Sequence, residues 1–295
     1  MPVFSGIWVP LVTPFADGAI DFAALRRLAE HLLEGGVAGL VVCGSTGEAA
    51  ALSEAEQLAV LDALLEIVPG QQLVMGLAGN HLADVLAMQR EVQRRSVAGL
   101  LVPAPYYIRP SQEGLLAWFG AIADAAEVPL ILYDIPYRTG ARIDLATLRE
   151  LARHPRIVAI KDCGGNSDTT QALIADGQLD VLAGEDAQLF STLCLGGSGA
   201  IAASAHIHPR QFVRLVECIA AGELQAARTI FYLLLPLIRL MFAEANPAPV
   251  KSLLARQGLI TDELRAPMQR SSADLVGRLH EALATSEGAS QPRWA

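Results

Sequence analysis

The sequence predicts a (β/α)8 barrel followed by a carboxy-terminal helical appendage. Eight short apolar segments recur between residues 7 and 203, and stretches with helical periodicity lie between them. The apolar segments are nearly continuous, which is typical of parallel strands that are covered on both faces. Strands that alternate with helices in this way favour a barrel. A doubly wound sheet is the alternative, but no GxGxxG motif follows the first segment.

The elements follow one another in a regular order. Helix starts are expected at Asp21, Ser53, Ser111 and Asp144, whose side chains can accept hydrogen bonds from first-turn N–H groups. Ser53 and Glu56 have the spacing of a capping box. The expected strands are IWVPLVT (7–13), GLVV (39–42), QLVMG (72–76), GLLV (99–102), PLILY (129–133), IVAIK (157–161), LDVLA (179–183) and GAIAA (199–203).

After residue 222 the strand pattern disappears. We therefore expect residues 1–222 to form a catalytic barrel and residues 223–295 a helical domain. The most apolar late segment, IFYLLLPLIRLMFA (230–243), is interrupted by Pro236 and Arg239 and is too short for a bilayer span. It is expected to be a buried or interfacial helix, and no membrane association is predicted.

Composition narrows the function classes. The 295 residues are 52% hydrophobic, with a mean hydropathy of +0.37, which indicates a large core or a large subunit interface. A net charge of −9 without a basic stripe argues against nucleic acid as a partner. The four cysteines are far apart in sequence, and we see no signal peptide, so a reduced, cytoplasmic protein is expected. No metal site is predicted, and His206 and His208 are interpreted as structural.

The last residue of the sixth expected strand is a lysine, Lys161. Lysine is rarely buried without a partner, and only about four in ten thousand free lysines are neutral at pH 7. An apolar barrel interior disfavours the ammonium, lowers the pKa and enriches the nucleophilic amine, which condenses with ketones to a Schiff base. A lysine that reaches solvent, or pairs with Asp162 or Glu185, is the structural alternative.

Other chemically capable residues follow the neighbouring strands, whose carboxyl ends share one rim. Tyr133 ends the preceding strand, and a phenol can carry a proton to and from a reacting carbon. The GSTGE loop (44–48) offers hydroxyl and backbone N–H groups that can hold a small carboxylate. Arg138 can bind a carboxylate bidentately, and Tyr106 and Tyr107 are expected to protrude from their loop. Ordinary turn chemistry and loop packing are the structural alternatives for these residues.

Five motifs stand at the strand ends and in the late helical region: GSTGE (44–48), PYYIRPSQEG (105–114), YDIPYRTG (133–140), IVAIKDCGGN (157–166) and NPAPVK (246–251). Taken together, they resemble the dihydrodipicolinate synthase and N-acetylneuraminate lyase family of pyruvate-dependent aldolases and lyases. The resemblance runs from about residue 5 to residue 270. It implies a lyase that condenses pyruvate with L-aspartate 4-semialdehyde in lysine and diaminopimelate biosynthesis, and usually a homotetramer built as a dimer of dimers.

The resemblance also implies the catalytic roles. Lys161 forms the imine with pyruvate, so that no separate cofactor is needed. Tyr133 acts as the proton shuttle and is linked through the hydroxyl of Ser45 to Tyr107 of a neighbouring subunit.

Binding roles follow in the same way. Thr46 and the backbone near Ile201 are expected to hold the pyruvate carboxylate, and Arg138 the carboxylate of the semialdehyde. Gly184, in the GED segment after the seventh strand, is expected among the substrate-binding residues. Asn80, Asp84 and Tyr106 match a lysine-binding allosteric pocket of the family.

Three departures from the family pattern favour a second hypothesis. Ser45 stands where threonine is usual in the synthases, and Ile108 and His206 stand where asparagine is frequent. They favour a paralogue that uses the same lysine and tyrosine on another aldehyde or on a 2-keto-3-deoxy sugar acid. A non-catalytic binding protein on the same scaffold is the remote third hypothesis.

Overall fold

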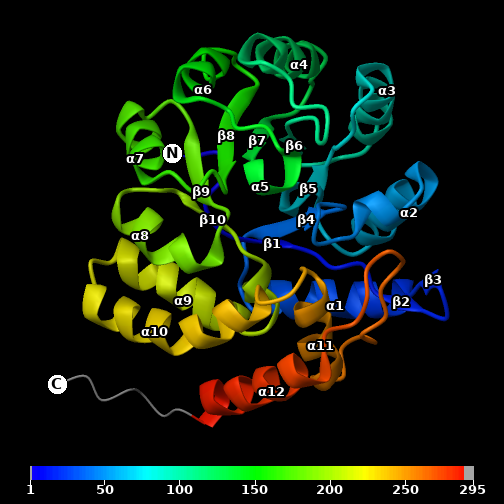
Figure 1. Cartoon of the computed structure of the whole chain (residues 1–295), viewed down its shortest axis with the longest axis vertical. Coiled ribbons are helices and arrows are strands. Elements are labelled where there is room, and N and C mark those ends of the chain that lie inside the picture. Colours follow the sequence, from blue (N-terminus) through cyan, green and yellow to red (C-terminus); the bar gives the residue numbers. More distant parts are fainter. Residues whose placement is uncertain (1, 289–295) are drawn as a thin grey trace.

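The computed structural model describes residues 2–288, and its centre is a closed barrel of eight parallel strands (Figure 1). Each strand pairs with the next along the chain, and β1 pairs with β10 to close the barrel. The predicted barrel is confirmed, and every expected segment contributes a strand. The strands are β1 (Gly6–Pro10), β4 (Gly39–Val42), β5 (Leu73–Gly76), β6 (Gly99–Pro103), β7 (Leu130–Asp134), β8 (Ile157–Asp162), β9 (Asp180–Ala183) and β10 (Gly199–Ile201).

Helices surround the barrel and alternate with its strands (Figure 1). The side chains of Asp21 and Ser111 cap their helices as expected, and Ser53 with Glu56 forms the predicted capping box. Asp144 also stands at a helix start, without a side-chain cap bond. The helices are α1 (Phe22–Glu34), α2 (Glu54–Leu65), α3 (Leu82–Gln93), α4 (Gln112–Asp124), the single turn α5 (Pro136–Thr139), α6 (Leu145–Leu151), α7 (Ser167–Asp176), α8 (Leu189–Cys194) and α9 (Pro209–Ala220).

Two groups of buried apolar side chains make up the core. One lies mainly between the strands and the surrounding helices, and the other fills the barrel interior, with Trp8 and Leu101 among its members. In β8, Ala159 belongs to the interior group and Ile160 to the outer group. Because side chains alternate along a strand, Lys161 is directed into the barrel interior.

The first strand is shorter than predicted: β1 ends at Pro10, not at residue 13. The N–H group of Val12 donates to Nε2 of His206 (3.2 Å), so a side chain replaces the strand partner there. Nδ1 of His206 contacts the carbonyl oxygen of Ala203 at 2.8 Å. Burial of the ring lowers the pKa of His206 to about 4. The structural interpretation of His206 is confirmed.

A short hairpin follows that the apolar pattern did not predict. It pairs β2 (Phe15–Ala16) with β3 (Ala19–Ile20). Its turn residues, Asp17 and Gly18, have φ angles of 52° and 79°, the conformation that Asp-Gly favours in two-residue hairpins.

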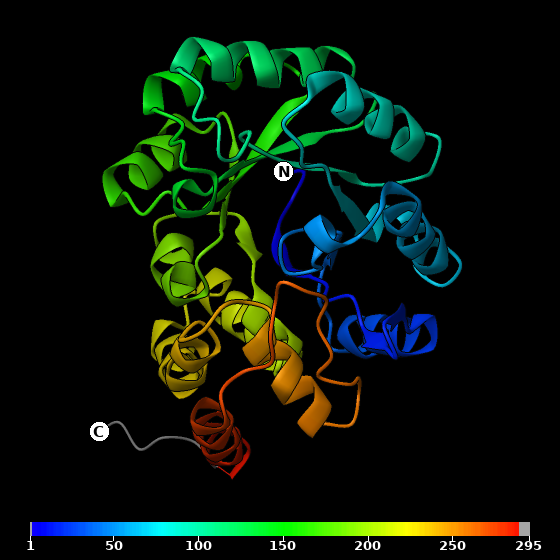
Figure 2. The same ribbon diagram turned by 45° about the vertical axis from the view of Figure 1, so that its right-hand side comes forward.

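The described chain beyond residue 222 is helical, as predicted. It contains α10 (Leu224–Met241), α11 (Ala248–Arg256) and α12 (Ala273–Gly288). Figure 2 shows the orange chain between α10 and α12 reaching back to the barrel. Since α10 also packs against α9, the domain division at residue 222 stays a prediction.

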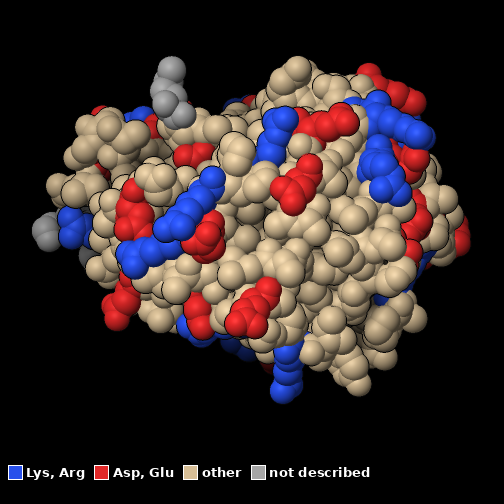
Figure 3. Space-filling view, turned by 90° about the horizontal axis from the view of Figure 1, so that it is seen from above, with Lys and Arg blue, Asp and Glu red and all other residues tan. Residues whose placement is uncertain are grey.

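Among residues 2–288, α10 is the one helix long and apolar enough to cross a membrane by length and composition. Its mean hydropathy is 1.3, and 39% of it is buried. One such helix is weak evidence for a membrane span, because the core helices of soluble proteins have the same character. On the face of the molecule seen in Figure 3, lysines and arginines are interspersed with acidic side chains and form no continuous basic stripe.

Candidate active site

Lys161 and Tyr133 lie side by side at the carboxyl ends of adjacent strands. They are direct partners in the register of β7 and β8. The Nζ atom of Lys161 lies 4.3 Å from the centroid of the Tyr133 ring. Both residues are buried, with 5% and 6% of their surface exposed. The predicted pairing of an amine with a phenol at one rim is therefore present in the structure.

Burial sets the protonation of both groups. It lowers the pKa of Lys161 against the opposing effects of Cys163, Asp186 and Glu185, and the positive charge of Arg138 adds a smaller lowering effect. Burial also raises the pKa of Tyr133 well above its ordinary value, against a hydrogen bond with Ser45. The amine is thus shifted towards its nucleophilic form beside a phenol that keeps its proton.

Gly184 makes room for the lysine. It follows β9, and its N–H donates to the carbonyl oxygen of Asp162 at 2.9 Å. A Cβ atom at this position would lie 2.3 Å from Sγ of Cys163 and 3.0 Å from Cγ of Lys161. Only glycine permits this close approach of the β9 end to the lysine stem.

Lys161 and Tyr133 line a pocket at this rim of the barrel. The GSTGE loop contributes Ser45 and Thr46 to the lining, and the end of β10 contributes Ile201. Thr46 is buried, and its Oγ1 accepts a hydrogen bond from Nδ2 of Asn246 (2.8 Å). The loop is therefore tied to the start of the NPAPVK segment, 200 residues further along the chain.

Arg138 stands at the mouth of the pocket, on the single-turn helix α5 directly after β7. Beside it, the hydroxyl of Tyr137 donates to Oε1 of Glu185 at 2.9 Å. This bond links the ends of β7 and β9 next to Lys161, and it places a carboxylate and a guanidinium near each other at the opening.

Several pocket residues were not among the predicted ones: Asn246, Asp186, Tyr137 and Phe242. The first three belong to motifs at strand ends or in the NPAPVK segment, so a full reading of those motifs would have found them. Asp186 accepts a hydrogen bond from the Ser204 N–H at 2.6 Å, and burial raises its pKa to about 6. Phe242 has no sequence signal of its own, because it reaches the site only through the packing of α10.

The single chain does not bring every predicted residue into this pocket. Tyr107 is 88% exposed and has a φ of 74° on the loop after β6, outside the pocket lining. Asn80 and Asp84 lie exposed at the start of α3, where Asp84 contacts His81 at 2.9 Å, and Tyr106 is 43% exposed. The catalytic role of Tyr107 and the allosteric roles stay predictions.

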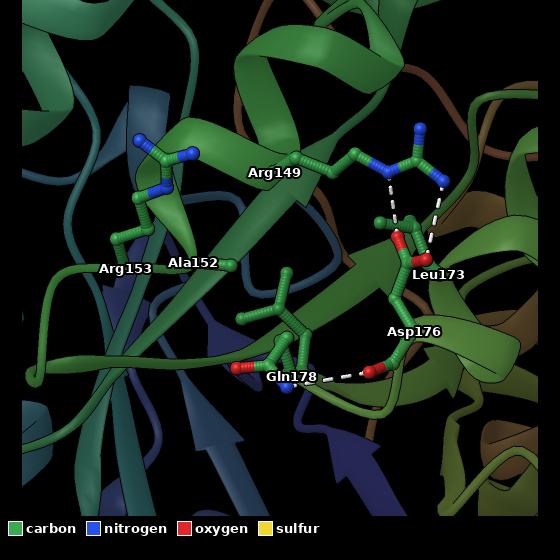
Figure 4. Close-up of a pocket in the computed structure, with 7 residues that line it drawn as sticks. Arg149, Ala152, Arg153, Leu173, Asp176 and Gln178 are labelled. Atoms are coloured by element: carbon green, nitrogen blue, oxygen red, sulfur yellow. Dashed lines mark hydrogen bonds and ion pairs between the residues drawn. The ribbon is translucent and has the colours of Figure 1, made fainter.

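A second hollow, of about 340 Å³, lies between α6 and α7 (Figure 4). The carboxyl ends of these helices lead into β8 and β9, so the hollow lies at the end of the barrel opposite Lys161. Its most polar feature is already neutralised: Arg149 holds Asp176 through two bonds of 2.7 and 3.1 Å. Within residues 2–288, the structure brings together no group of three or more metal-binding side chains.

The barrel with a buried amine beside a buried phenol defines a class of protein, the Schiff-base-forming (β/α)8 lyases. The chain belongs to the dihydrodipicolinate synthetase family, whose sequence pattern matches residues 3–286. The family resemblance predicted from the motifs is confirmed.

Individual relatives agree over nearly the whole chain. The 4-hydroxy-tetrahydrodipicolinate synthase of Pelobacter propionicus is 38% identical over 269 residues, which cover 90% of this chain and 93% of the relative. The structure of the synthase from Cyanidioschyzon merolae with lysine bound superposes with a TM-score of 0.94 at 29% identity, and covers 97% and 99% of the two chains. A monomeric dihydrodipicolinate synthase variant has a TM-score of 0.93 at 32% identity and covers 97% of each chain.

Proposed function

We propose that this chain condenses pyruvate with L-aspartate 4-semialdehyde to give 4-hydroxy-tetrahydrodipicolinate. The observation that carries the proposal is the buried Lys161 amine beside Tyr133, with an arginine at the mouth of the same pocket. Eight relatives named as 4-hydroxy-tetrahydrodipicolinate synthases, at 34% to 39% identity, support it.

The first half of the reaction takes place at the lysine. The amine of Lys161 adds to the ketone of pyruvate, and water leaves to give the imine. Loss of a proton from the pyruvate methyl carbon gives the enamine, and Tyr133 lies close enough to Nζ to take part in these proton transfers. Thr46 and the backbone near Ile201 hold the pyruvate carboxylate during these steps. The covalent imine replaces any separate cofactor.

The second half joins the two substrates. The enamine carbon attacks the aldehyde and forms the new carbon–carbon bond, while Arg138 binds the carboxylate of the semialdehyde. The amino group of the semialdehyde then adds to the imine carbon and displaces Lys161 as the ring closes. The lysine is regenerated, and one water is released over the whole reaction.

The proton path extends beyond one subunit in this proposal. Tyr107 of a neighbouring copy joins Tyr133 through Ser45, in a cytoplasmic homotetramer. The exposure of three consecutive apolar or aromatic residues, Tyr106, Tyr107 and Ile108, supports an interface there, because such a patch is unfavourable in water. Mass measurement in solution tests the assembly, and a monomer with full activity would contradict the role of Tyr107.

Two measurements test the reaction. Incubation with pyruvate and borohydride, followed by mass spectrometry, is expected to label Lys161, and absence of the adduct would remove every catalytic hypothesis. Turnover of pyruvate with the semialdehyde is then compared with cleavage of N-acetylneuraminate and 2-keto-3-deoxygluconate. A large preference for a sugar acid would overturn the synthase assignment in favour of the paralogue.

A further inference from the structure

An ion pair is buried where the end of the GSTGE loop meets α11. Nζ of Lys251, on α11, lies 2.5 Å from Oε1 of Glu48, the last residue of the loop. Lys251 is fully buried and Glu48 is 5% exposed. The lysine also donates to the carbonyl oxygen of Glu263 at 2.8 Å. Two charged side chains with no role in the proposed chemistry therefore lie in the interior.

A second cation from the carboxy-terminal region joins the pair. The backbone N–H of Arg265 donates to Oε2 of Glu48 (3.1 Å), and its guanidinium donates to Glu56 (2.7 Å). The ring of Phe15 has Lys251 Nζ at 4.3 Å and Arg265 Cζ at 4.6 Å from its centroid. Each cation gains a favourable contact with the ring, so the network joins the hairpin, the GSTGE loop and residues 251–265.

The loop that this network holds has an unfavourable backbone. Cys43 precedes the loop and Glu48 ends it, and they have φ angles of 52° and 54° although neither is glycine. Such conformations persist only where the surroundings impose them. Thr46 is fixed separately by Asn246. The carboxy-terminal region thus contacts the loop at two points, one on each side of Gly47.

We propose that Glu48 and Lys251 are positioning residues that hold the GSTGE loop so that Ser45 and Thr46 face the pyruvate bound to Lys161. The proposal rests on the proposed function, since it assigns the loop to the pyruvate carboxylate. The carboxy-terminal helices then do more than cover the barrel, because their lysine sets the shape of a substrate-binding loop.

Stability alone is a weak explanation for this pair. Replacing a buried ion pair with well-packed hydrophobic side chains of similar size often leaves stability unchanged or raises it, whereas removing one partner is destabilising. A purely structural role therefore predicts that the double variant E48Q/K251M behaves as the wild type. Glutamine is chosen at position 48 because it removes the charge and keeps an acceptor for the Arg265 N–H. A positioning role predicts that the double variant folds normally but binds pyruvate weakly.

The test uses the full chain and compares K251M, E48Q and E48Q/K251M by thermal melting and by borohydride trapping at increasing pyruvate. We expect the double variant to melt near the wild type and to require roughly tenfold more pyruvate for half-maximal labelling, which corresponds to about 1.4 kcal/mol. Labelling at saturating pyruvate should stay within about threefold of the wild type, because Lys161 itself is intact. A folded double variant with wild-type half-saturation overturns the proposal.

Two further variants complete the test. R265M removes the guanidinium contacts with Glu56 and Phe15 but keeps the backbone N–H bond to Glu48, so half-saturation is expected to stay within about twofold of the wild type. A change in R265M as large as that in the double variant would place the support of the loop outside the Glu48–Lys251 pair and count against the proposal. R149M breaks the pair with Asp176 at the other end of the barrel (Figure 4) and should leave pyruvate labelling unchanged. If the wild type forms no adduct, the proposed function fails. If the wild type forms the adduct and the variants bind pyruvate equally well, only the positioning role fails.

Discussion

Replacement of Gly184 by alanine is the sharpest test of how the site is built. The new Cβ would lie 2.3 Å from Sγ of Cys163, 2.9 Å from the carbonyl oxygen of Asp162 and 3.0 Å from Cγ of Lys161. Cβ contacts under 3.0 Å are essentially absent from proteins, so the sulfur or the backbone at position 184 must shift by about 0.7 Å in total. The backbone oxygen and the lysine stem leave little room for this movement.

Two consequences follow from that displacement. Overpacking of an interior usually costs about 1–3 kcal/mol, which is expected to lower the melting temperature by about 2–4 °C per kcal/mol in a chain of this size. A misplacement of 1 Å near the chemistry costs roughly a hundredfold in rate. We therefore expect Gly184→Ala to slow borohydride-trapped labelling of Lys161 by about ten- to a hundredfold.

The assay has a matched control and a rescue. Gly120 lies within α4, and a Cβ added there would meet no side chain within 4 Å, so Gly120→Ala should stabilise the chain by about 0.5–1 kcal/mol and leave labelling unchanged. Adding Cys163→Ala to Gly184→Ala removes the closest contact and should restore part of the labelling rate. A Gly184→Ala chain with wild-type melting and labelling would refute the close-approach argument.

The remaining predictions concern single groups. Tyr137→Phe releases the Glu185 carboxylate at the mouth, where it competes with the substrate carboxylate for Arg138. The KM for the semialdehyde should therefore rise by about threefold or more, while the KM for pyruvate stays unchanged. Steady-state kinetics that show no change in either KM would reject this prediction. Tyr133→Phe should still form the Lys161 adduct but lose about 10²-fold or more in turnover, which single-turnover kinetics can measure. Since His206 has a folded pKa of about 4 against 6.5 in the unfolded chain, stability should fall by about 3 kcal/mol as pH drops from 6.5 to 4, and urea titrations of His206→Gln should lack that component.

The strands were predictable because each of them is a short run of apolar residues in the sequence. Every barrel strand begins within one residue of its expected position. A strand of a parallel sheet is covered on both faces, so its whole length must be apolar, and the limits of the apolar run mark where the strand begins. The end of β1 was not predictable, because it depends on a hydrogen bond between Val12 and His206, almost 200 residues apart. The hairpin at Asp17 and Gly18 has a local signal in the sequence, the Asp-Gly pair between its two short strands.

Part of the site was predictable from the sequence as well. Lys161 and Tyr133 end adjacent strands, so topology alone brings them together. Asn246 and Phe242 come from the carboxy-terminal region, and no local pattern shows that this region returns to the barrel rim. Tyr107 lies outside the pocket of the single chain, and a proposed partner subunit cannot be derived from periodicity.

The structure shows the surroundings of Ser45, Ile108 and His206, the three departures from the family pattern that favoured the paralogue. His206 is fully buried, and both ring nitrogens contact the backbone, so it belongs to the packing of β1 and does not face the substrate. Ser45 keeps a hydroxyl that hydrogen-bonds to Tyr133, so the change from threonine retains the group that the proposed proton path needs. Of the three departures, only Ile108 still favours the paralogue, and its side chain is 55% exposed on the loop that carries Tyr107. Arg138 at the mouth, by contrast, offers a planar cation that can bind the carboxylate of an amino-acid aldehyde. We therefore expect the choice of aldehyde to depend on the residues at the pocket mouth and not on the interior around Lys161.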